Sequence, residues 1–326
     1  MRNPLEKRTK ATGMTWCTER GLGLLSFSTE SWHCPPLGGA CSIQLGGVFH
    51  RVGRMRNPLP FLREYPRVTA QALRAARGTG DRQLLADAAR MRRDALLDRV
   101  GVRVRPQLFG RPIACSNVGS LAFAFEDVVL SGHYAVDLGT PRPLIIDCGA
   151  NIGLTVLYFH HRYPGAMITA FEPAPGAFQN LKHNTAGIDH LRLECAAVGG
   201  RDSKMEMWIE GDSMHAGAYH REGVTQRAMV PVKRLSPYID QPVDLLKLDV
   251  EGAESDVLHE LEASRALGNV KAMVVEFHHN LGPPHLGAVL SLLERAGFGY
   301  QLATQPNSPI KPVDDFEDIQ IYARRL

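Results

Sequence analysis

An acid and two glycines mark the end of the first strand-like apolar run of this chain, where their types and spacing could bind a ligand. The run Leu144–Cys148 contains Asp147 and leads into Gly149, Asn151 and Gly153. Glycine lets backbone approach a ligand without an intervening Cβ, and the start of a following helix offers free N–H groups. The spacing differs from the G-x-G-x-x-G pattern of dinucleotide-binding turns. A carboxylate just before the glycines favours a ligand with a positively charged amino-acid end over a pyrophosphate.

The ends of the next two apolar runs carry groups suited to a nucleoside. The run Met167–Phe171 is followed by Glu172, nineteen residues after the last of these glycines. A carboxylate at the end of a second strand accepts hydrogen bonds from a ribose diol. The run Leu191–Cys195 continues into two alanines, and an adenine pocket needs small apolar residues of this kind. Glu172 and Ala197 are therefore the candidate contacts for the ribose and the base of a cofactor.

Two later runs, Val243–Asp249 and Ala272–Phe277, end in or beside further acids and a histidine. Because the carboxyl ends of parallel strands face the ligand crevice, Asp249, Glu276 and His278 are expected to converge there. The period of two places Glu276 and His278 on one face. These residues could act as general base, metal ligands or orienting groups. We expect His278 or Asp249 to be the base, since an imidazole titrates near neutral pH and Asp249 lies at the crevice.

No metal-ligand spacing is recognisable in these segments, so the sequence assigns no metal ligand. Assistance by a divalent metal held on Asp249 and Glu276 stays an alternative. Ser213 and His215 lie in the segment after the third run. They are expected either to contact the substrate or to belong to a surface loop.

The elements that must position these residues alternate between strand-like and helix-like patterns from residue 143 onward. Such alternation predicts a mainly parallel sheet covered on both faces. Two late runs, Gly299–Ala303 and Ile319–Ala323, predict a terminal hairpin, and Met205–Glu210 and Met229–Lys233 predict extra strands. The expected helices are Leu154–Tyr163, Pro175–Asn184, Ala253–Leu261 and His285–Ala296.

The order of these motifs resembles that of the FkbM-type S-adenosylmethionine-dependent methyltransferases, over roughly residues 110–325. The resemblance is carried by Ile-Asp-Cys-Gly-Ala-Asn-Ile-Gly, Phe-Glu-Pro, Val-Pro-Val, Leu-Lys-Leu-Asp-Val-Glu-Gly-Ala-Glu and Val-Val-Glu-Phe-His. It implies an α/β fold of the class I methyltransferase type, with a Rossmann-like seven-stranded sheet whose last strand is antiparallel.

The resemblance also implies S-adenosyl-L-methionine as cofactor. Asp147, Gly149, Asn151 and Gly153 would then line its methionine side, and Glu172 would hold its ribose hydroxyls. The expected enzyme is a methyltransferase acting on a hydroxyl of a sugar, a glycolipid or a natural product. The alternatives are a nucleotide-dependent oxidoreductase, against which the missing G-x-G-x-x-G argues, and a non-catalytic binding module on the same fold.

Charge is distributed very unevenly along the chain. The net charge of +3 combines a net +10 in residues 51–112, which hold fifteen Arg and no Lys, with a net −9 in residues 113–326. We expect residues 58–110 to be a basic helical lead-in, with two helices between 60 and 99 separated near Gly78–Gly80, and 111–326 to be the methyltransferase domain. Residues 1–57 show little periodicity and are expected to be disordered or a non-native extension. The string Met-Arg-Asn-Pro-Leu at Met1 recurs at Met55. The recurrence is either a sign of a natural translation start at Met55 or a coincidence.

The arginines of the lead-in most simply form a solvated helical face. They could also contact an anionic substrate, a membrane surface or the acidic body. The lead-in contains few aromatic residues and no recognisable motif for reading nucleic-acid sequence. These features argue against nucleic acid as its partner. No apolar run reaches membrane-spanning length, and no C-x-x-C pair occurs among the six cysteines. The N-terminus also makes a poor signal peptide. We therefore expect a cytoplasmic location.

Overall fold

The structure is a computed structural model of the 326-residue chain. It describes residues 81–209, 226–279, 286–303 and 318–326, together with four strand segments nearer the N-terminus. Those segments form one sheet in the order β1-β2-β3-β4. Their bounds are β1 (Trp16–Glu19), β2 (Leu22–Leu25), β3 (Cys41–Leu45) and β4 (Val48–Val52). The first helix expected between residues 60 and 78, and the remainder of the segment 1–57, lie outside the described residues.

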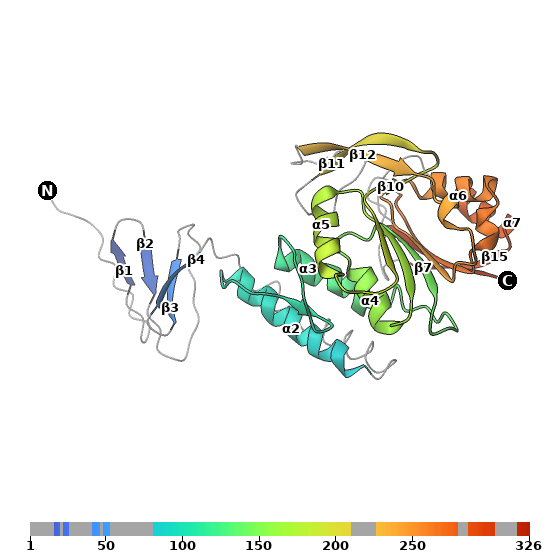
Figure 1. Ribbon diagram of the computed structural model, residues 1–326. Helices are drawn as coiled ribbons and strands as arrows, with labels where there is room; N and C mark the ends of the chain where they lie inside the picture. The colour runs from blue at the N-terminus through green and yellow to red at the C-terminus, as the bar shows by residue number, and fades with distance from the viewer. Residues whose placement is uncertain are drawn as a thin grey trace.

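A seven-stranded sheet forms the centre of the molecule, in the order β15-β16-β14-β13-β7-β8-β9 (Figure 1). Within it β7, β8, β9, β13 and β14 are parallel, while β16 runs antiparallel to both of its neighbours. This confirms the predicted class I methyltransferase fold with an antiparallel last strand. The strands are β7 (Leu144–Cys148), β8 (Met167–Phe171), β9 (Leu191–Glu194), β13 (Leu245–Leu248), β14 (Ala272–Phe277), β15 (Phe298–Ala303) and β16 (Ile319–Arg325).

The direction in which successive strands are added reverses between β7 and β13. From β7 the chain adds β8 and β9 on one side, and then returns to place β13 and β14 on the other. In open α/β sheets a ligand crevice lies at such a reversal, outside the carboxyl ends of the strands. The topology therefore locates the crevice above the ends of β7 and β13.

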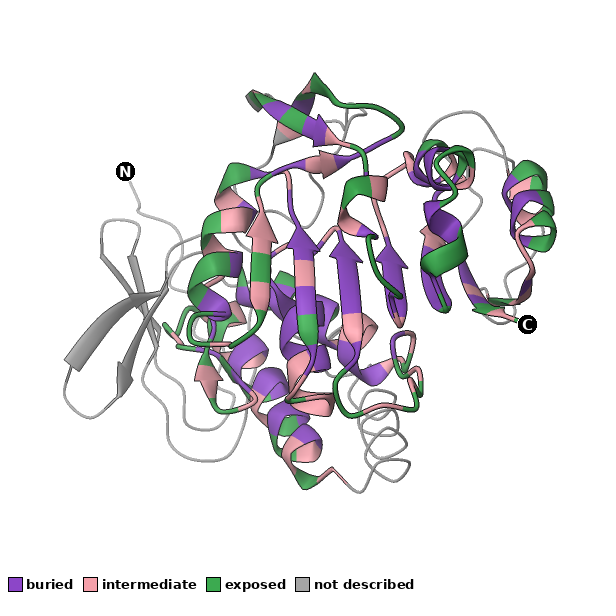
Figure 2. Ribbon diagram, turned by 45° about the vertical axis from the view of Figure 1, so that its right-hand side comes forward, coloured by how far each residue is buried: buried purple, intermediate pink, exposed green. Residues whose placement is uncertain are grey.

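Two hydrophobic clusters cover the two faces of this sheet. Figure 2 shows the strands of its middle coloured as buried along most of their length, and all four residues of β13 are buried. Burial on both faces explains why these strands are continuous apolar runs in the sequence. One cluster contains side chains of α2, α3, α4 and α5, and the other those of α6 and α7. The helices are α2 (Arg82–Arg99), α3 (Val118–Phe125), α4 (Leu154–Arg162), α5 (Pro175–Asn184), α6 (Glu254–Ala263) and α7 (Leu286–Arg295).

Smaller elements connect and extend these layers. The predicted extra strands are present: β11 (Ser203–Ile209) pairs with β12 (Gln226–Lys233), which pairs with β10 (Ala197–Val198). Ser213 and His215 lie outside the part of the chain that the structure describes. The remaining elements are β5 (Gln107–Leu108), β6 (Arg111–Pro112), the π-helix η1 (Glu126–Leu130) and the 3-10 helices η2 (Ser236–Tyr238) and η3 (Ala266–Asn269). None of the helices among the described residues has the length and apolarity needed to span a bilayer.

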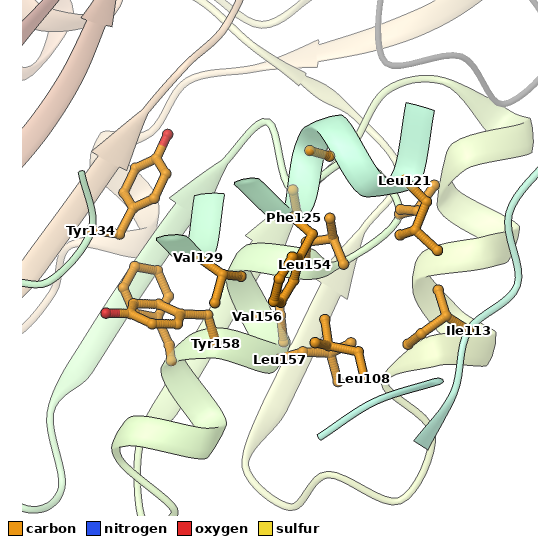
Figure 3. Close-up of a cluster of buried hydrophobic side chains, with 14 of the residues drawn as sticks. Leu108, Ile113, Leu121, Phe125, Val129, Tyr134, Leu154, Val156, Leu157 and Tyr158 are labelled. Carbon is orange, nitrogen blue, oxygen red and sulfur yellow. The ribbon is translucent and has the colours of Figure 1, made fainter. Parts of the chain in front are cut away.

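The described part of the basic lead-in packs into the same core as the sheet. Asp81 caps α2 by accepting a hydrogen bond from the Leu84 backbone, and Leu84 and Met91 are buried in the cluster that also contains Phe125 and Leu157. Figure 3 shows the packing of Phe125 against the side chains of α4. The domain boundary at residues 110 and 111 stays a prediction, but apolar side chains on both sides of it share one cluster.

The arginines of α2 are not all on a solvated face. The Arg92 side chain is only 6% exposed, and its guanidinium lies 2.6 Å from the Glu126 carboxylate of η1. Arg93, the next residue, is 64% exposed and pairs with its neighbour Asp94. Arg92 therefore ties the lead-in to the acidic body, whereas Arg93 fits the interpretation as a solvated face.

We predict that Arg92→Met lowers the free energy of unfolding by about 3 kcal/mol, because removing one partner of a buried ion pair leaves the other charge uncompensated. The matched change Arg234→Met is expected to alter it by less than ~0.5 kcal/mol, because the paired side chains of Arg234 and Asp202 are 46% and 59% exposed and exposed pairs contribute little. Urea unfolding of the two variants measures the difference. Equal effects of the two substitutions would show that the Arg92 pair does not hold the lead-in to the body.

Candidate active site

A buried lysine lies where the loops after β7 and β13 meet. Lys247, in the middle of β13, is 1% exposed. Its ammonium donates to the Gly149 carbonyl at 2.8 Å and lies 3.2 Å from a carboxylate oxygen of both Asp147 and Asp249. The ring of Tyr134 is 5.8 Å from the same nitrogen. Burial opposes the charged form, but Asp147, Asp249 and Tyr134 together raise the pKa of Lys247 well above its usual value. The lysine is thus a cation that joins the loop after β7 to the loop after β13.

The loop after β7 can take its course only because of glycine. Gly149 has a φ of +87°, and a Cβ there would lie 1.9 Å from the Asp249 carbonyl oxygen. The Gly149 and Ala150 backbone amides both donate to the Phe171 carbonyl, at 3.0 and 2.9 Å. Gly153, with a φ of +95°, is the N-cap of α4 and makes no side-chain cap. The first amides of α4 therefore have no capping side chain from Gly153.

Asp147, in β7, is held by two partners. It is wholly buried, it accepts a hydrogen bond from the Thr155 hydroxyl, and its other oxygen pairs with Lys247. In this arrangement it supports the loop through Thr155 and Lys247. Direct contact between Asp147 and a ligand stays a prediction.

Glu172, after β8, holds the glycine turn from the side. It is 6% exposed, and its two oxygens accept hydrogen bonds from the backbone amides of Asn151 and Ala174, both at 2.8 Å. The Asn151 amide can point this way because Asn151 is left-handed, with a φ of +48°. Burial raises the pKa of Glu172 to about 7 despite these two donors. Each carboxylate oxygen keeps a second acceptor position, as binding a diol requires. Ala197 lies at the start of β10, partly buried beside the wholly buried Ala196.

The structure brings Asp249, Glu276 and His278 together, as the strand ends predict. His278 Nδ1 lies 2.8 Å from the buried Glu254 carboxylate of α6, and its Nε2 lies 3.9 Å from Asp249 and 3.8 Å from Glu251. Burial alone would lower the pKa of His278, but these three carboxylates raise it to about 10. The imidazole is therefore held as a cation at neutral pH. The expectation that it titrates near neutrality, which favoured it as a base, does not fit this environment.

Glu276 and Asp249 differ in their surroundings. Burial, and then the charge of Asp249, raise the pKa of Glu276 to about 8, so Glu276 is largely protonated at neutral pH. The Asp249 side chain is 27% exposed and is paired with Lys247. Among the predicted catalytic residues, Asp249 combines access to the crevice with a cation that stabilises its charged form.

Three residues of the site were not predicted from the sequence: Lys247, Glu254 and Tyr134. The position of Lys247 inside an otherwise apolar strand could have revealed it, because a charge is rarely buried without partners. Glu254 is 1% exposed and also accepts hydrogen bonds from the Val250 and Gly252 amides, which fixes the loop after β13. Tyr134 comes from the segment before β7, and no local pattern connects it to the crevice. Figure 3 shows its hydroxyl pointing away from the apolar cluster.

This sheet order, with a glycine turn beside an acid at the end of the second strand, defines a methyltransferase of the class I fold. Residues 147–300 match the model of the methyltransferase FkbM domain. Methyltransferase sdnD of Sordaria araneosa is 31% identical over 173 residues, which cover 42% of this chain and 67% of that protein. The chain belongs to the FkbM family of methyltransferases.

Two further relatives carry more specific names. The 31-O-demethyl-FK506 methyltransferase FkbM of Streptomyces tacrolimicus is 28% identical over 231 residues, covering 58% of this chain and 86% of that protein. The 2-O-methyltransferase NoeI of Sinorhizobium fredii (strain NBRC 101917 / NGR234) is 28% identical over 141 residues, covering 37% of this chain and 58% of that protein.

We predict that Gly149→Ala destabilises the protein by about 3–5 kcal/mol, because it adds backbone overlap with Asp249 to the strain of a left-handed alanine. Gly187→Ala is the matched control: Gly187 has a φ of +74° and open space around its Cβ position. It should cost only the ~1–2 kcal/mol of left-handed strain. Chemical denaturation of the two variants measures the difference, and similar losses would show that β7 and β13 do not approach this closely.

The raised pKa of His278 predicts a pH dependence of stability. A pKa of about 10 in the folded chain against 6.5 in a free imidazole contributes stability that is complete below pH 6.5 and is lost as the pH rises toward 10. We expect the free energy of unfolding to fall over this window, and the fall to be smaller in His278→Gln. Nitrogen NMR should show His278 still protonated at pH 8. A His278 titration centred near pH 6.5 would contradict this arrangement.

Proposed function

We propose that the chain transfers the methyl group of S-adenosyl-L-methionine to a hydroxyl group of a small-molecule acceptor, such as a sugar, a glycolipid or a natural product. The observation that carries the proposal is the convergence of the glycine turn, Glu172 and Asp249 at one edge of the sheet. The names of the Streptomyces and Sinorhizobium relatives support oxygen as the acceptor atom. Membership of a methyltransferase family argues against the oxidoreductase and the non-catalytic module.

The residues at the crevice fit this cofactor. Glu172 retains acceptor positions for the ribose hydroxyls, the turn Gly149–Gly153 presents backbone without side chains, and Ala197 would border the adenine. Carboxylates outnumber cations around the crevice, which suits a ligand with a positively charged sulfur and ammonium group. When bound, the cofactor supplies an activated methyl group for an in-line displacement.

The chain itself has to orient the acceptor and remove its proton. We assign proton removal to Asp249, because His278 is held as a cation and Glu276 is largely protonated at neutral pH. Lys247 holds one Asp249 oxygen at 3.2 Å, so the other oxygen is available to an acceptor hydroxyl. Protonated Glu276 can donate a hydrogen bond to the acceptor, which makes it an orienting group.

Calorimetry with S-adenosylhomocysteine tests the cofactor half of the proposal. We expect Glu172→Gln to weaken binding at least tenfold, because the amide replaces an acceptor of the ribose hydroxyls with a donor. Asp244→Asn is the matched control: Asp244 also accepts a backbone amide, that of Leu144 at 2.8 Å, but at the opposite end of the sheet. Asp244→Asn should bind like the wild type. Absence of binding to the wild type would overturn the proposal.

The acceptor half is tested by incubating the enzyme with methyl-labelled cofactor and a glycolipid or metabolite extract, followed by mass identification of the product. Loss of a general base typically costs about 10²–10⁴ in rate. Asp249→Asn should therefore slow product formation on this scale while its affinity for S-adenosylhomocysteine stays close to that of the wild type. Label on a nitrogen, or unchanged turnover in Asp249→Asn, would contradict O-methylation with Asp249 as the base.

A further inference from the structure

One face of the β14–β16 ladder carries a block of four polar side chains, those of Glu276, His278, Asp318 and Gln320. Glu276 pairs with Gln320 in this antiparallel ladder. The same register, continued by one step of two residues, sets His278 opposite Asp318. Because residues two apart share a face and cross-strand partners lie on the same face, all four side chains point to the same side. One ligand atom from each of Glu276, His278 and Asp318 lies within 4.8 Å of the others.

The histidine of this block is oriented as a metal ligand would be. His278 Nδ1 is engaged by the Glu254 carboxylate at 2.8 Å, and metal-binding histidines commonly donate their other ring nitrogen to a carboxylate in this way. Nε2 then faces Asp249 and Glu251 at 3.9 and 3.8 Å. These distances are too long for hydrogen bonds.

A separate observation comes from Gln320. This residue is 8% exposed, and its amide donates a hydrogen bond to Glu276. Its Oε1 is buried and has no hydrogen-bond partner among the residues that the structure describes. Buried polar atoms are nearly always satisfied, so this oxygen points to a ligand or water beside Glu276.

The geometry points to a divalent-cation site formed by Glu276, His278 and Asp318, with Glu254 orienting the histidine and the Gln320 amide oxygen beside it. Two carboxylates and one imidazole suit a cation of the Mn²⁺ class. Because metal ligands must be deprotonated, binding of the cation displaces the protons that His278 and Glu276 carry in its absence. The site adjoins Asp249, so a cation there could also polarise the acceptor oxygen of the proposed function. That use rests on the proposed function, whereas occupancy of the site does not.

Manganese binding can be measured without methyl donor or acceptor, from the loss of the free Mn²⁺ signal in electron paramagnetic resonance. We expect the wild-type chain to bind one Mn²⁺, and Glu276→Gln and Asp318→Asn each to raise the dissociation constant at least tenfold. Zn²⁺ should displace the ion, since it binds such ligands more tightly. Asp318 is exposed, so its substitution is compatible with folding, and thermal unfolding verifies both variants.

The matched control is Asp189→Asn, which makes the same change at an exposed acid in the turn between α5 and β9. It should leave Mn²⁺ binding unchanged. No saturable binding to the wild type, or equal weakening in Asp189→Asn and Asp318→Asn, would overturn the site. S-adenosylhomocysteine calorimetry on the same samples separates this result from the proposed function, because cofactor binding can persist where Mn²⁺ binding is absent.

Discussion

The structure depends most on one buried interaction, the Lys247 ammonium between Asp147 and Asp249. A lysine can be buried in the middle of a sheet only if opposite charges and carbonyl oxygens replace its water. Asp147, Asp249 and the Gly149 carbonyl supply that replacement. Because these groups lie on two different loops, satisfying the lysine also sets the distance between the loops. The crevice is therefore shaped by an electrostatic requirement of the core.

The glycine turn follows from the same constraint. Once Lys247 draws the loops after β7 and β13 together, the backbone of Gly149 meets the Asp249 carbonyl, and no side chain fits there. Glu172 completes the arrangement from the third loop by accepting the Asn151 amide. The residues that would contact a cofactor are thus held by backbone contacts between strand ends. The packing of the core therefore also fixes the loops that would bind the cofactor.

Electrostatics also divides the roles of the acids and the histidine. His278 is surrounded by Glu254, Asp249 and Glu251, and this raises its pKa to about 10. Glu276 is partly buried beside Asp249, and its pKa rises to about 8. The charge of Asp249 therefore favours both the charged histidine and the neutral glutamate. Asp249 is paired with the Lys247 ammonium and is left as the carboxylate that can accept a proton.

The sequence by itself determined the sheet, most of its covering helices and both ends of three of its strands. Leu144–Cys148, Met167–Phe171 and Ala272–Phe277 were predicted with the bounds that the structure shows, because a strand buried on both faces is an apolar run with visible ends. The convergence of Asp249, Glu276 and His278 also followed, since parallel strands bring their carboxyl ends to one edge.

Only the tertiary structure decided what each of these residues can do. The roles of Lys247, Glu254 and Tyr134, the cationic state of His278 and the burial of Arg92 against Glu126 all depend on partners distant in sequence. Burial and the placement of charges set the pKa of a group and decide whether an arginine faces solvent or a carboxylate. Local spacing in the chain carries neither quantity, because both arise only when separate elements pack together.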